Sequence, residues 1–103
     1  MTNPNDRLII NHAQDDEDNL VLFLAGDLDI GTAPKLRSFI EHVIQDGPVK
    51  MKLDLSQLSY LDSSGYIALV NARRQTEGAK CDFDLTNMPP WMTDFFDLSA
   101  LEA

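Results

Sequence analysis

An acid, two serines and a glycine lie between two apolar runs in the segment LSYLDSSGYIALV, residues 58–70. This pattern predicts that a strand ends before Asp62 and that a helix begins there. Backbone N–H groups at a helix N-terminus lack intrahelical partners and carry the positive end of the helix dipole, so an anion such as phosphate is stabilised there. Ser63 and Ser64 are therefore candidates for a site where a group is attached or transferred.

A purely structural role explains the same residues. Asp62 or Ser63 is expected to cap the helix, and Gly65 is expected to give room for close packing. A helix cap and a modification site do not exclude each other. From these residues alone, both interpretations stay open.

Catalytic chemistry at this junction lacks the necessary partners. A serine nucleophile needs a base within reach, usually a histidine, and nothing in the sequence connects Ser63 with His12 or His42. The spacing differs from the G-x-S-x-G nucleophile elbow. The sequence contains neither metal-ligand spacing nor a glycine-rich phosphate loop. We therefore expect a protein that is not an enzyme and that uses no metal and no cofactor.

The composition bounds the class of protein. A chain of 103 residues with 44% hydrophobic and 24% charged residues suits one folded domain, which we expect to span residues 1–103. The single cysteine, Cys81, is expected in the core, and one cysteine is compatible with a reducing compartment. The N-terminus lacks the pattern of a signal peptide, and no apolar run approaches a membrane span. A cytoplasmic protein without membrane contact is expected.

The net charge of −9 restricts the partners. Nucleic acid is disfavoured, because phosphate binding needs a basic face and no basic residue follows Lys80. A protein partner with a basic patch fits the charge, although solubility alone also explains it. We expect a monomer, because the sequence indicates no long exposed apolar stripe.

The first half of the chain predicts a hairpin and a helix. Residues 7–13 and 20–26 read as strands around a polar turn, and the second of them is apolar enough to be a central strand covered on both faces. Thr32 is the expected N-cap of a helix that has Pro34 in its first turn and that Gly47 and Pro48 end. Its apolar face comprises Leu36, Phe39, Ile40, Val43 and Ile44.

The second half alternates strands and helices. A strand over 49–56 points Val49, Met51, Leu53 and Leu55 to one side, and the helix after Ser63 ends near Gly78. A strand over 80–86 and a short proline-started helix with Met92, Phe95 and Phe96 on its buried side follow. The order is strand, strand, helix, strand, helix, strand, helix. It predicts an α/β fold with a small, mostly parallel, mixed sheet of about four strands and three helices packed on it.

Three segments, GDLDIGTAPKLRSFI, LDLSQLSYLDSSGYIALVNARR and PPWMTDFFDLSAL, resemble the STAS domain family. The greatest similarity is to single-domain bacterial anti-sigma factor antagonists, and it extends from about Leu8 to Leu101. The pattern D-L-S-x-L-x-x-L-D-S-S-G is its most specific part. This chain departs from the family pattern after the serines, where G-L-G is common in the family and this sequence has Gly65-Tyr66-Ile67.

The resemblance implies a phosphorylation switch. The phosphorylated serine of the family corresponds to Ser63, and Ser64 is a secondary site. Asp62 precedes that serine, and Asp29 corresponds to an aspartate near the family's site. The implied partner surface comprises Asp29, Asp62, Ser63, Ser64, Gly65 and Tyr66.

The resemblance also implies the partners. A GHKL-type serine kinase, which is itself the anti-sigma factor, binds the unphosphorylated form and releases the sigma factor. Phosphorylation breaks the complex, and a PP2C-type phosphatase resets it. Two alternatives remain: a partner switch with a non-sigma target, such as secretion or biofilm regulation, and a non-switching STAS subunit of a transport complex.

Overall fold

The computed structural model describes residues 7–95. Its strands are β1 (Leu8–Gln14), β2 (Asn19–Leu28), β3 (Lys50–Leu61) and β4 (Asp82–Thr86). Its helices are α2 (Ala33–Val43), extended by the 3-10 turn η1 (Ile44–Asp46), α3 (Ser63–Gly78) and α4 (Pro90–Phe95). The predicted order of strands and helices is confirmed.

One four-stranded sheet has the order β1-β2-β3-β4. β1 and β2 form the predicted antiparallel hairpin, whereas β2, β3 and β4 run parallel. Asp15 holds the hairpin turn, because its carboxylate accepts the N–H groups of Glu17 at 2.8 Å and Asn19 at 3.0 Å. The mixed, mostly parallel sheet is therefore as predicted.

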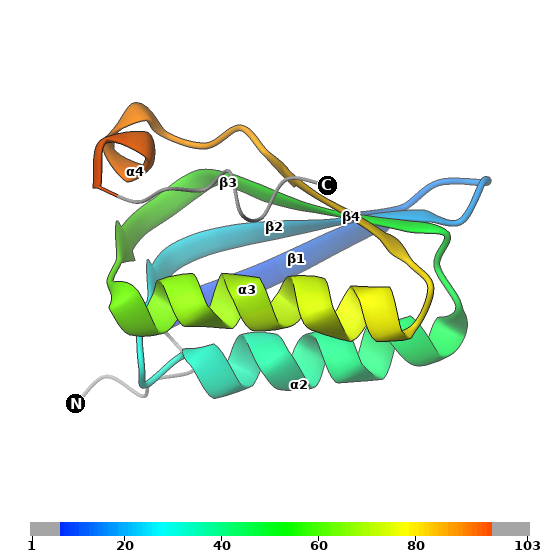
Figure 1. Cartoon of the computed structure of the whole chain (residues 1–103). Helices are drawn as coiled ribbons and strands as arrows, with labels where there is room; N and C mark the ends of the chain where they lie inside the picture. Colours follow the sequence, from blue (N-terminus) through cyan, green and yellow to red (C-terminus); the bar gives the residue numbers. More distant parts are fainter. Residues whose placement is uncertain (1–6, 96–103) are drawn as a thin grey trace.

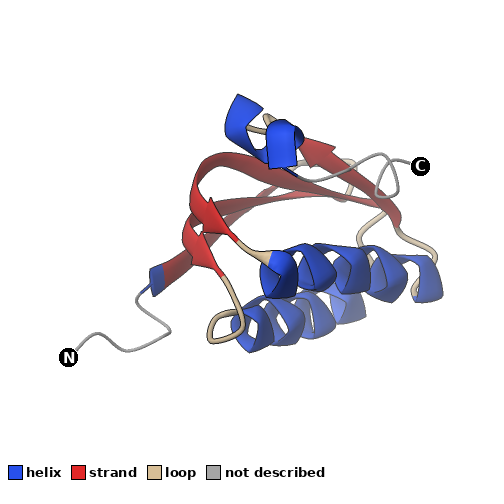
Figure 2. Ribbon diagram, turned by 60° about the vertical axis from the view of Figure 1, so that its left-hand side comes forward, coloured by secondary structure: helices blue, strands red, loops and turns tan. Residues whose placement is uncertain are grey.

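The two long helices α2 and α3 lie side by side against one face of the sheet (Figure 1). The short α4 lies on the other side, near one end (Figures 1 and 2). The prediction that β2 is covered on both faces is wrong: it is a central strand, but Phe23 on its second face is 39% exposed. Both parallel crossovers place their helices on the same face of the sheet, so the long helices cover only one face of β2. The apolar run in the sequence of β2 is therefore longer than burial of that one face requires.

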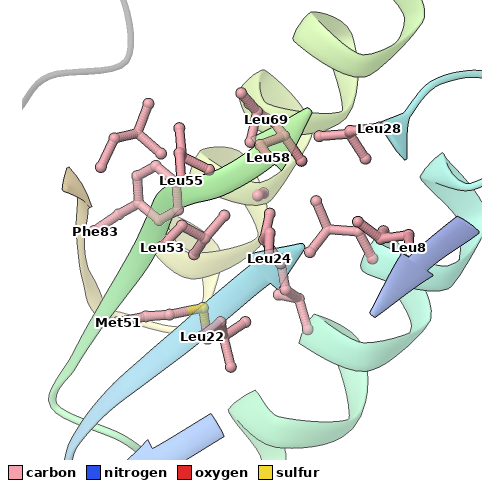
Figure 3. Close-up of a cluster of buried hydrophobic side chains, with 14 of the residues drawn as sticks. Leu8, Leu22, Leu24, Leu28, Met51, Leu53, Leu55, Leu58, Leu69 and Phe83 are labelled. Carbon is pink, nitrogen blue, oxygen red and sulfur yellow. The ribbon is translucent and has the colours of Figure 1, made fainter. Parts of the chain in front are cut away.

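The core fills the space between the sheet and the helices α2 and α3 (Figure 3). It is built mainly from leucines of β2 and β3, whose alternation along each strand directs every second side chain inward. α2 contributes Leu36, Ile40 and Val43, whereas Phe39 and Ile44 are partly buried at its edge. The fully buried large side chains are Leu8, Leu22, Leu24, Leu28, Leu36, Ile40, Met51, Leu53, Leu55, Leu69 and Met92.

β3 is longer than the sequence predicts. It begins at Lys50, one residue later than predicted, and Val49 before it is 57% exposed. It continues to Leu61 through a register irregularity after Asp54. There the Asp54 carboxylate accepts hydrogen bonds from the Ser56 N–H and hydroxyl and from the Asn87 side chain. This cluster lies at the irregularity, and the strand continues past it to the end of the sheet, where Ser63 and Ser64 follow.

The C-terminal elements follow the predicted pattern. Cys81, Phe83 and Leu85 are buried, and the thiol of Cys81 is free. Met92 of α4 is fully buried, as predicted. The expectation for Phe96 lies outside the described residues, as does that for the side chain of Phe95.

Candidate functional site

The loops that leave β2 and β3 lie at the same edge of the sheet, where the two arrowheads end (Figure 2). The parallel register pairs Asp27 with Tyr60 and Leu28 with Leu61. Asp29 and Asp62 each follow directly after this last pair, and each precedes a helix. The sheet therefore brings together two acids that are 33 positions apart in the chain.

Asp62 caps α3. Its backbone is extended, with φ −114° and ψ −171°, and its Oδ1 accepts the Gly65 N–H at 2.9 Å. This is the geometry of an N-cap, in which a short acidic side chain satisfies a backbone donor of the first turn. Of the two caps that the sequence allowed, the structure uses Asp62.

Ser63 is the first residue of α3, and its side chain is exposed. Within residues 7–95 its hydroxyl takes part in no hydrogen bond. Ser64 is half-buried and faces the neighbouring helix α2 across a groove. Because Asp62 supplies the cap, the Ser63 hydroxyl is available at the positive end of the helix.

Gly65 is buried under the end of β2. A Cβ at this position would lie 2.2 Å from the Leu28 carbonyl oxygen and 2.6 Å from Leu61 Cδ1. Only glycine lets the first turn of α3 approach the sheet this closely. The predicted packing role of Gly65 is confirmed.

Asp29 organises the loop between β2 and α2. Its Oδ1 accepts the N–H groups of Gly31 at 2.9 Å and Thr32 at 3.1 Å. Thr32 occupies the N-cap position, as predicted, but its side chain makes no capping bond. Its hydroxyl donates to the Asp27 carbonyl at 2.8 Å instead, and the carboxylate of Asp29 holds the loop that leads into α2.

Arg7 forms an ion pair with Asp29 that the sequence analysis missed. Both terminal nitrogens of its guanidinium donate to the two carboxylate oxygens of Asp29, and Nη1 lies 3.7 Å from the carboxylate of Asp27. The hydrogen bond from Arg7, opposed by burial and aided by the N–H groups of Thr32 and Gly31, lowers the pKa of Asp29. The only signal in the sequence is that Arg7 stands directly before the first strand.

The pKa of Tyr60 responds to the charges of the carboxylates around the junction. Its hydroxyl donates to Asp62 Oδ2 at 3.4 Å, and the charge of Asp62 raises the pKa of the phenol. Burial and the charges of Asp29 and Asp27 add to this increase. Three carboxylates therefore act on one point beside Ser63, and Arg7 is the cation that offsets two of them.

A groove of about 320 Å³ lies between the N-terminal halves of α2 and α3. Ile67, 56% exposed, and Ile30, still more exposed, form its apolar part. Tyr66, which belongs to the partner surface that the resemblance implies, is partly buried and packs against the core. Ile67 was not predicted as a site residue, although its spacing of one helical turn from Ser64 places both residues on the same face of the helix. The groove is lined by Ile30, Ala33, Pro34, Arg37, Ser64, Ile67, Ala68 and Asn71.

Neither histidine belongs to this constellation. The ring of His12 packs on Phe39, with 5.6 Å between ring centres, and His42 lines a different surface depression on α2. Within residues 7–95, no three histidine, cysteine or acidic side chains are grouped as metal ligands. No helix in the described part of the chain is long and apolar enough to cross a membrane. The arrangement suits binding and modification.

Known proteins share both sequence and fold with this chain. The model of the family described as Mlab, STAS domain, matches residues 11–103. The anti-sigma-B factor antagonist of Listeria monocytogenes is 29% identical over 87 residues, which cover 84% of this chain and 75% of that protein. The corresponding antagonist of Listeria innocua matches equally.

Solved structures of other proteins also have a fold similar to that of this chain. The phosphorylated form of SpoIIAA, a Bacillus cell fate determinant, has a TM-score of 0.69 and 26% identity, covering 90% of this chain and 85% of that one. An anti-sigma factor antagonist from Mycobacterium paratuberculosis has a TM-score of 0.67 and 28% identity, with coverages of 78% and 67%. The chain belongs to the STAS domain family.

Proposed function

We propose that this chain is a single STAS domain, residues 1–103, that regulates a protein partner through phosphorylation of Ser63. In its unphosphorylated form it binds a GHKL-type serine kinase that is an anti-sigma factor, and the sigma factor is released. Phosphorylation of Ser63 abolishes this binding, and a PP2C-type phosphatase restores it. The regulator acts in the cytoplasm as a monomer, by binding and without an enzymatic activity of its own.

One observation carries the proposal: Ser63, the first residue of α3, is exposed and its hydroxyl makes no hydrogen bond within the described residues, while Asp62 caps the helix. A kinase can therefore modify Ser63 without removing a stabilising hydrogen bond. The neighbouring groove offers exposed apolar area to the same partner. The antagonists named above, including one solved in a phosphorylated form, support this function by similarity.

The charge of a phosphate explains how binding would be lost. A phosphoserine carries about −1.5 to −2 charges. In the free protein, the helix N-terminus stabilises this charge. In the complex, the charge must be desolvated near Asp29 and Asp62, and one poorly matched buried charge in an interface costs about 2–5 kcal/mol. The dissociation constant would rise about 30-fold or more.

The residues have different roles in the proposed interface. Ser63 carries the phosphate, and Ser64 is the secondary site at the rim of the groove. Asp29 and Asp62 supply negative charge for a basic partner. Gly65 and Tyr66 support this surface from the core side, because Gly65 is buried and Tyr66 packs partly on the core.

A pull-down from the source cells tests the proposal. Ser63→Ala is expected to retain a GHKL-type kinase, identified by mass spectrometry, and Ser63→Asp is expected to lose it. Ser59→Asp is the matched control, because it adds the same charge to an exposed position on β3 without a helix N-terminus. The control should bind like the wild type.

Incubation of the wild-type protein with the recovered kinase and ATP completes the test. Phosphate is expected on Ser63, and Ser63→Ala should take up none except at Ser64. Equal recovery of the same partners by the folded Ser63→Ala and Ser63→Asp proteins contradicts the switch. Recovery of transporter subunits, or of a kinase unconnected with any sigma factor, would instead support the non-switching or the non-sigma alternative.

A further inference from the structure

We propose that Arg7 is the intramolecular partner of the phosphate on Ser63, and that it exchanges the carboxylate of Asp29 for the phosphate when Ser63 is modified. The inference rests on the proposed phosphorylation of Ser63 and adds a residue to the switch. It starts from one feature of the site: a bidentate arginine ion pair stands beside a modifiable serine at the edge of the sheet.

The topology brings Arg7 near Ser63. Leu8 pairs with Gly26, and the end of β2 pairs with the end of β3, so Arg7 and Ser63 lie at the same edge of the sheet. Neighbouring strands are about 4.8 Å apart, so β1 and β3 are separated by about 10 Å. An extended arginine and a phosphoserine, reaching from either side, span that separation.

Asp29 can lose Arg7 without losing its other partners. Its Oδ1 already accepts the N–H groups of Gly31 and Thr32, at 2.9 and 3.1 Å. These bonds are local to the loop and hold the carboxylate in place. Arg7 is the replaceable partner, because its side chain is 32% exposed and reaches Asp29 from a distant segment.

Gly31 makes room for the guanidinium. A Cβ at position 31 would lie 2.6 Å from Arg7 Nη2 and, less tightly, 3.3 Å from Asp29 Oδ1. The backbone of Gly31 has no left-handed conformation that would exclude an alanine. Gly31→Ala should therefore displace Arg7 while the loop remains formed, which gives a second way to remove the ion pair.

A phosphate is the stronger partner for an arginine. Guanidinium matches both carboxylate and phosphate with two parallel hydrogen bonds, but the phosphate carries nearly twice the charge. The other charged or titratable groups around the junction include Asp27, Asp62, the phenol of Tyr60 and Lys35, which donates to the Leu8 carbonyl oxygen from α2. Arg37 lines the groove with Ser64, but it is paired with Glu41 on α2. After the exchange, Asp27 and Asp29 face a partner without their cation, so the surface becomes more negative than the phosphate alone makes it.

The test uses the full chain with phosphoserine installed at position 63 during translation, so that no kinase or partner is needed. Phosphorus NMR follows the second ionisation of the phosphate in the wild type, Arg7→Lys and Arg7→Gln. The midpoint should be lowest in the wild type, intermediate with lysine and highest with glutamine. Arg74→Gln is the matched control: it removes the same charge about 16 Å along α3 and should titrate like the wild type.

The Nε–H signal of Arg7 gives a second readout. It should move on phosphorylation in the wild type and stay near its unphosphorylated position in Gly31→Ala, whose phosphate midpoint should rise toward that of Arg7→Gln. Equal midpoints for wild type and Arg7→Gln overturn the inference. Equal midpoints for wild type and Arg7→Lys also overturn it, because a distant charge then explains the shift. Neither result bears on kinase binding, so the two proposals fail separately.

Discussion

At the scale of single residues, the junction before α3 divides its tasks among adjacent side chains. Asp62 caps the helix, Gly65 allows close contact with β2, and the exposed Ser63 hydroxyl makes no hydrogen bond to any part of the chain that the structure describes. The two structural tasks leave the serine available for modification. The motif therefore combines a structural role and a regulatory role without requiring one residue to perform both.

The steric role of Gly65 leads to a prediction. Gly65→Ala places a methyl group 2.2 Å from a backbone oxygen, so either α3 or the end of β2 must move. We expect a loss of about 1–3 kcal/mol in the free energy of unfolding, as for other overpacked sites, measured by urea denaturation. Gly78→Ala is the control, because its Cβ meets nothing within 4 Å. That variant should gain up to about 1 kcal/mol, and equal losses in both would contradict the role of Gly65.

At the scale of elements, α3 has two faces with different uses. Gly65, Leu69, Ala72 and Thr76 form the buried face. Ser64, Ile67, Ala68 and Asn71 form the face that lines the groove with α2. The same helix therefore holds the core together and presents the surface proposed for the partner.

Two truncations on α3 separate these faces. Ile67→Ala should change the free energy of unfolding by less than about 0.5 kcal/mol, because the side chain is mostly exposed. It should weaken binding of the partner about 10-fold or more, measured by calorimetry, if the groove is the docking site. Leu69→Ala, at a fully buried position, should cost about 2–5 kcal/mol in stability. Unchanged affinity in Ile67→Ala would exclude the groove.

At the scale of the whole molecule, carboxylates link folding to pH. The N–H and side chain of Asn19 lower the pKa of Asp15, and Arg7 lowers the pKa of Asp29. Burial raises the pKa of Asp54, but hydrogen bonds from Ser56 and Asn87 outweigh it and the pKa is lowered. A carboxyl group whose pKa is lower in the folded than in the unfolded chain stabilises the fold above its unfolded pKa.

Acidification should therefore destabilise the protein. The unfolded carboxyl groups have a pKa of about 3.8, so this stability is present above that pH and is lost as the pH falls below it. In urea denaturation between pH 6 and 2.5, Asp29→Asn should show a smaller loss than the wild type. Asp16→Asn removes the same charge from an exposed turn position and should follow the wild type. Parallel curves for all three proteins would show that Asp29 contributes nothing to this dependence.

Local signals in the sequence were sufficient to predict the order of the elements, the mixed sheet and the position of the serines. Alternating and helical spacing of apolar residues mark each element, and Asp62 caps its helix through the N–H of Gly65, only three positions away. The family resemblance was recognisable from the same contiguous segments. These features depend on short stretches of chain, whose preferences for strand, turn and helix are expressed wherever the stretch is placed.

Contacts between distant segments were decided only by the tertiary structure. The Arg7–Asp29 ion pair joins residues 22 positions apart, and the groove forms where Ile30, from the loop before α2, and Ile67, from α3, come together. The exposed face of Phe23 and the extension of β3 to Leu61 also depend on packing. The physical reason is that strand register and helix packing minimise the exposed apolar area of the whole chain. No single stretch of sequence contains that information.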